Sequence, residues 1–159
     1  MNTQFAEDHI VVNCTTESSD IFATAMKSDI YSMQDWRDIF FVLTVTSGGT
    51  GTARCHLRSL DAVSAATTHG MPCRYRYRYG STGASTLTAW TLATSSGFLT
   101  TADCNYIIEI WGRADDLYVG DKYIMFDSTE VANDPVGGTL CAIFTNGRYQ
   151  EDIQRGILT

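Results

Sequence analysis

The chain has little proline, little charge and no long apolar runs, and each of these features limits the classes of protein that it can belong to. Only 2 of its 159 residues are proline and 18% are charged, whereas 44% are hydrophobic. That composition indicates a folded domain with a weakly charged surface, of the kind that proteins cover with partners. No apolar run approaches the roughly 20 residues of a membrane-spanning helix, so we expect no membrane partner.

Positive charge is also scarce. Eleven Lys and Arg residues stand against 18 Asp and Glu residues, which gives a formal net charge of -7. This excess opposes binding to a phosphate backbone, so we expect no nucleic-acid partner. The five cysteines form no Cys-x-x-Cys pair, and residues 1–8 hold neither the basic region nor the apolar core of a signal peptide. We therefore expect reduced, mostly buried thiols.

Motifs of catalysis and cofactor binding are missing as well. The chain has no Gly-x-Ser-x-Gly elbow and no phosphate-binding loop. Asp115, Asp116 and Asp121 offer oxygen ligands, but they lack the spacing of a calcium loop and we interpret them as turn residues. His69 and Cys73 have no second pair at zinc spacing. The sequence predicts no enzyme activity, no metal site and no cofactor.

What the chain does have is a series of strand-like segments. Residues 39–46 are apolar at nearly every position, which predicts a central strand covered on both faces. The glycine-rich turn at 48–51 and the alternating segment 53–58 predict that this strand continues into a hairpin. The core is expected to contain the side chains of Phe41, Leu43, Ile108 and Ile110.

The C-terminal third adds three more apolar segments. Residues 105–111, 123–126 and 139–145 are separated by polar turns and predict a β-meander. In all, about eight strands with turn signals between them and little helix predict an all-β fold, a β-sandwich of the jelly-roll kind, over residues 29–149.

The two ends differ from this pattern. Residues 1–28 are expected to form an extended arm, in which residues 10–12 are an edge strand or a segment that orders on a neighbour, and residues 19–26 form one short helix. Residues 150–159 form a polar tail that no later segment covers. Its apolar residues are candidate partner contacts: Ile153, Ile157 and Leu158.

The most regular segment runs from residue 73 to residue 79, where arginine and tyrosine alternate. On a strand, Arg74, Arg76 and Arg78 share one face and the three tyrosines share the other. Two interpretations are open: the arginines meet carboxylates of another subunit, or the strand is simply amphipathic. Nucleic-acid binding fits less well, because the rings that bases stack on lie opposite the arginines.

The C-terminal strands also carry a resemblance. An apolar strand, the turn Asp115-Asp116-Leu117-Tyr118-Val119-Gly120, a second strand, a polar loop and a last strand ending in Asn146-Gly147-Arg148-Tyr149 resemble small β proteins of tailed bacteriophages. Those proteins are similar to capsid decoration, or cement, proteins, and the resemblance covers about residues 29–149.

The resemblance implies a structural virion protein on the outer surface of an icosahedral phage head, made in the host cytoplasm. The implied partners are the major capsid protein and further copies of the chain, as a dimer or trimer. The alternative is another virion role, either a neck or tail component or a carbohydrate-binding module on the particle. Exposure of Trp36 or Trp90 beside polar loops would favour glycan binding.

Overall fold

A computed structural model describes residues 9–14, 22, 25–47, 51–81, 84–101, 106–132 and 136–147. Its strands, in chain order, are β1 Ile10–Asn13, β2 Met26–Lys27, β3 Tyr31–Ser32, β4 Trp36–Ser47, β5 Thr52–Leu60, β6 His69–Met71, β7 Cys73–Ser81, β8 Ala84–Leu87, β9 Thr91–Ala93, β10 Phe98–Leu99, β11 Tyr106–Arg113, β12 Tyr123–Ala132 and β13 Val136–Gly147. Within the described ranges the helical content is one 3-10 turn, η1 (Ala114–Asp116). That turn is too short and too polar to cross a membrane.

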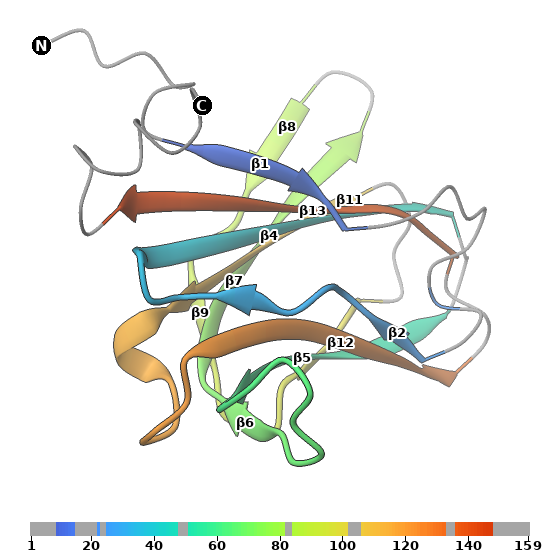
Figure 1. The fold of residues 1–159 in the computed structure, drawn as a ribbon. Helices are drawn as coiled ribbons and strands as arrows, with labels where there is room; N and C mark the ends of the chain where they lie inside the picture. Colours follow the sequence, from blue (N-terminus) through green and yellow to red (C-terminus); the bar gives the residue numbers. More distant parts are fainter. Residues whose placement is uncertain are drawn as a thin grey trace, which may run out of the picture.

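The strands form two antiparallel sheets packed face to face (Figure 1). The larger sheet has the order β1, β13, β4, β11, β7, β8, with β9 also paired to β7. The smaller sheet has the order β10, β5, β12, β2, with β3 on β12 and β6 on β5. The predicted all-β sandwich is confirmed.

Eight of these strands are paired in a nested order. The first pairs with the last, β1 with β13, and the pairs β2 with β12, β4 with β11 and β5 with β10 follow inside it. A long hairpin wrapped into two sheets in this way is a jelly roll. Strands β6 to β9 form an insertion between β5 and β10, and its strands β7, β8 and β9 extend the larger sheet beyond β11.

Two local pairing predictions are wrong. β4 and β5 are no hairpin, because β4 lies between β13 and β11 whereas β5 pairs with β12 in the other sheet. β11, β12 and β13 are no meander, because β12 lies in the smaller sheet while its two neighbours flank β4. Turn residues between strands predict that the chain reverses, but they do not show which sheet the next strand joins. Here the chain crosses to the other sheet, so each strand buries one face in the shared core.

Residues 86–92 alternate like a single strand, but the structure divides them into β8 and β9. Between them, Thr88 binds β7 through both its groups: its hydroxyl accepts the backbone N–H of Tyr77 at 2.9 Å, and its own N–H donates to the Tyr77 carbonyl. Because the Thr88 hydroxyl occupies a backbone N–H that a strand would otherwise bond through a carbonyl, the regular pairing of β7 with its neighbour is interrupted here. The polar connection after residue 94 also contains an unforeseen strand, β10.

The N-terminal segment is built into both sheets where it is described. Residues 10–13 are edge strand β1 on β13, the first of the two alternatives, and the side chain of Phe22 is buried in the core. Met26 pairs in β2 and is not helical, because the edge of β12 offers it backbone partners that an isolated short helix lacks. The remainder of the predicted helix and the tail 150–159 lie outside the described residues.

The core lies between the sheets. Phe41, Leu43, Ile108 and Ile110 are completely buried, as predicted. The smaller sheet faces them with side chains that are also fully buried: Leu57, Ile124 and Phe126.

Candidate functional site: the outer face of the larger sheet and its corner pocket

The outer face of the larger sheet is apolar in its centre. Strand β4 was expected to be covered on both faces, but the described strands form only two layers, so only its inner face is covered. Phe40 and Val42 point away from the core and are half-buried. Apolar side chains at the centre of an uncovered sheet face are typical of a surface that meets a partner.

One cross-strand row runs across this face. Each residue in it lies directly opposite the next on the neighbouring strand, so all six share the outer face. We call this set the outer row: Val11, Ile143, Phe40, Trp111, Arg74 and Leu92. Its ends are the most open, with Val11 exposed by 56% and Leu92 by 68%.

The three candidate arginines lie on the outer face, as the alternation predicts. The Arg76 Nε donates to Glu109 at 2.6 Å, and Arg78 reaches the same carboxylate at 3.4 Å. Arg74 has no carboxylate within 4 Å among the described residues. The structure therefore places two of the three arginines in ion pairs within the chain and leaves one without such a pair there.

Two of these arginines, Arg74 and Arg76, lie over tryptophan rings. The Arg76 guanidinium lies 4.3 Å from the ring centre of Trp90, and that of Arg74 lies 5.7 Å from the ring of Trp111. Phe40 stacks on the same Trp111 ring at 5.8 Å. Stacking of this kind lowers the entropy that an arginine loses on binding, because its plane is already oriented.

The tyrosines of β7 point the other way, into the sandwich. Tyr75 stacks on Phe98 at 3.9 Å, and the Tyr77 hydroxyl donates to the Leu99 carbonyl at 3.2 Å. Burial raises the pKa of Tyr77, and the neighbouring tyrosine hydroxyls and the Cys55 thiol raise it further. The tyrosine rings therefore lie on the face opposite the arginines, as the alternation predicts.

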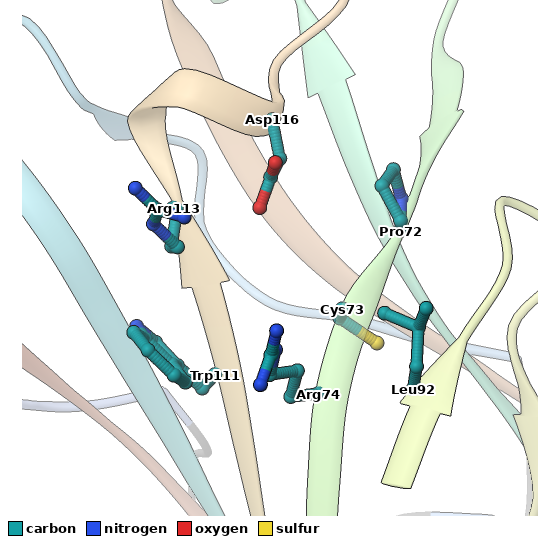
Figure 2. A pocket seen from close by; sticks show the side chains of 7 residues that line it. All are labelled: Pro72, Cys73, Arg74, Leu92, Trp111, Arg113 and Asp116. Atoms are coloured by element: carbon teal, nitrogen blue, oxygen red, sulfur yellow. The ribbon is translucent and has the colours of Figure 1, made fainter.

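A pocket of about 270 Å³ lies where the outer row meets η1 (Figure 2). Arg113 and Trp111 come from β11, Arg74 from β7 and Leu92 from β9, while Asp116 enters from η1. Figure 2 shows Asp116, Arg113 and Arg74 directed toward the same space. We call this the corner pocket; Pro72 and Cys73 complete its lining.

Asp38 holds two pocket-lining side chains, Trp111 and Arg113, in position. Its side chain is buried and accepts the indole N–H of Trp111 at 2.9 Å and the amide of Asn146 at 2.6 Å, with Arg113 at 4.0 Å. Arg113 also donates to Asp115 at 2.8 Å. Tertiary pairing therefore sets the position of both Trp111 and Arg113.

The sequence singled out the arginines of β7 but not Trp111, Glu109 or Asp38. Alternation along β11 would have put Glu109 and Trp111 on the outer face, opposite Ile108 and Ile110. Alternation could not show that β7 lies beside β11. It is this strand pairing that places Glu109 opposite Arg76 and Trp111 opposite Arg74.

The other sequence candidates take structural positions. Asp121 accepts hydrogen bonds from Ser59 at 2.5 Å and lies 3.0 Å from His69, so it joins β5 and β6 to the turn before β12. No group of three or more potential metal ligands occurs among the described residues. The tail contacts lie outside the described residues and stay a prediction: Ile153, Ile157 and Leu158.

Both tryptophans that bear on glycan binding are half-buried. Trp36 packs against the core and contacts Phe144 at a ring distance of 5.6 Å. Trp90 lies on the outer face, beside Trp111 at 5.9 Å, with Arg76 over its ring. Each ring is therefore partly covered by other side chains of the same chain.

No protein-family model matches the chain, and no curated protein does. The solved structure of the SPBc2 prophage-derived protein YomS is similar, with a TM-score of 0.47 and 12% identity over 87% of this chain and 94% of that chain. A likeness of this size defines neither a family nor a function.

Proposed function

We propose that this chain is a structural protein of a bacteriophage particle, a decoration protein that binds the outside of an icosahedral head. The observation that carries the proposal is the outer face of the larger sheet. Its central strands carry apolar side chains at positions that face solvent in the free chain, and its rim carries arginines stacked on tryptophans. Tryptophan and arginine are enriched at protein interfaces, and most other charged groups are depleted there.

The partner contact is centred on β4 and β11. Phe40, Val42 and Ile107 would pack against the major capsid protein or a neighbouring copy, and Arg76 and Arg78 would border that contact. Bound at junctions between capsid subunits, the chain adds buried area that internal DNA pressure must break before the shell opens. A symmetric dimer or trimer multiplies such contacts through avidity. The jelly-roll fold is also found in viral capsid proteins, which supports the proposal by analogy.

Quantitative mass spectrometry of purified particles tests the proposal. We expect a copy number equal to that of the major capsid protein or a simple fraction of it. A handful of copies per particle would assign the chain to the neck or tail, and absence from particles would overturn a virion role altogether.

A charge reversal tests the face itself. We expect Arg76→Glu to weaken binding to particles that lack the protein, because it replaces a stacked cation with a group that repels Glu109. Arg54→Glu is the matched control, since Arg54 lies on the outer face of the smaller sheet, on strand β5. Equal loss of binding in both variants would argue against the outer face of the larger sheet as the contact.

A further inference from the structure

We propose that the corner pocket binds a single neutral sugar ring, such as the terminal residue of a glycan. The inference rests on a hydrogen-bond donor, Arg74, and an acceptor, Asp116, that both line the pocket and form no ion pair with any other described residue. Arg74 and Asp116 have no opposite charge within 4 Å among the described residues. Figure 2 shows both directed into the space between them.

A sugar satisfies both groups at once. Each hydroxyl both donates and accepts, so one hydroxyl can take an N–H from Arg74 while its neighbour donates to the Asp116 carboxylate. Arg74 is already oriented by Trp111, and Arg113 by Asp115, so little side-chain freedom is lost on binding. Hydrogen bonds to charged groups are the stronger kind, which suits a small ligand.

The remaining wall is apolar and suits the C–H face of a sugar ring. Leu92, Pro72 and Trp111 line it. Leu92 is exposed by 68% in the free chain, so a ligand in the pocket would cover a large apolar side chain. The volume of about 270 Å³ lies just below the range of pockets for drug-sized ligands, roughly 300–1,000 Å³, and leaves room for one ring.

Other ligand classes fit less well. The charges in the pocket and on the residues paired with its lining balance, with Arg74, Arg113 and Arg37 against Asp116, Asp115 and Asp38, so an anion gains no net attraction. A nucleobase needs a free aromatic face, whereas Trp111 has Phe40 stacked on it and Arg74 over its ring.

The sugar site borders the proposed particle contact, because Phe40 stacks on Trp111, which lines the pocket; neither Phe40 nor Val42 lines the pocket itself. The contact is centred on Phe40 and Val42, whereas the pocket lies at the η1 end of the sheet. Sugar binding is measured on the free chain, so its failure leaves particle binding untouched, and failure of particle binding leaves the sugar site untouched.

Titration of the isotope-labelled full chain with glucose, galactose, mannose and N-acetylglucosamine, followed by two-dimensional NMR, tests the inference. We expect at least one sugar to shift the indole N–H of Trp111 and the amides of Arg74 and Leu92, with a Kd on the order of 1 mM. Asp116→Asn and Arg74→Ala should each weaken that binding by about tenfold.

Matched variants make the test specific. Arg78→Ala removes an exposed arginine from the same face of β7, and Leu87→Ala removes an exposed leucine opposite it; neither residue lines the pocket, so sugar binding should not change. Leu92→Ala should weaken binding. Three results would overturn the proposal: no shift with any of the four sugars, larger shifts with sodium acetate than with any sugar, or unchanged sugar binding in Arg74→Ala.

Discussion

The two faces of the larger sheet are built from the same strands and both carry large apolar side chains, but only the inner face is covered by a second layer. On the inner face Phe41, Leu43 and Ile110 are completely buried against the second sheet. On the outer face their sequence neighbours Phe40 and Val42 are only half-buried. Apolar content alone therefore does not distinguish a core face from an open face; the presence of a second layer does.

The largest difference is expected from two adjacent phenylalanines on β4. Phe41→Ala should lower the free energy of unfolding by about 3–5 kcal/mol, because it leaves a cavity in a packed core. Phe40→Ala should cost only about 1 kcal/mol, since a half-buried ring loses part of its transfer free energy. Urea denaturation measures both, and equal losses would show that the outer face is packed like a core.

A second test adds one methyl group to the inner face. In Gly112→Ala the new Cβ would lie 2.8 Å from a methyl of Leu57 and 2.9 Å from one of Ile124, so we expect a loss of about 1–3 kcal/mol from overpacking. The double variant with Leu57→Ala removes one of these contacts. Its unfolding free energy should fall by less than the sum of the two single changes, and strict additivity would contradict the crowding.

The third difference appears at alkaline pH. Burial raises the pKa of the Cys73 thiol from 9.0 to about 12, and the unfolded chain releases this proton first. The thiol's contribution to stability is thus complete below pH 9 and is lost as the pH rises toward about 12. In thermal unfolding followed against pH, Cys73→Ala should flatten this decline, and an unchanged decline would contradict the assignment to Cys73.

The smallest effect is expected from the ion pair on the outer face. Arg76 and Glu109 have side chains exposed by 25% and 17%, so a double-mutant cycle to alanine should give a coupling of at most about 1 kcal/mol. Arg78 remains 3.4 Å from Glu109 and offsets part of the loss. A coupling several times larger would mean that this pair stabilises the fold and is not mainly a surface feature.

Strand content and side-chain direction were predictable from local pattern. The alternation in residues 73–79 placed the arginines and tyrosines on the correct faces, and the apolar run at 39–46 identified the central strand. Strand partners were not predictable in this way. The hairpin and meander failed because a turn marks where a strand ends and carries no information on which sheet receives the next one.

By itself the sequence determined that the chain is a β-sandwich with Phe41, Leu43, Ile108 and Ile110 in its core, because the period of two along a strand is a local property. Only the tertiary structure decided that β1 meets β13, that Glu109 lies beside Arg76, and that Trp111, Arg74 and Asp116 surround one pocket. These contacts join residues far apart in the chain. They depend on the nested strand pairing of the jelly roll, which is stabilised by burial of apolar side chains between the two sheets. No single segment of the sequence specifies that pairing.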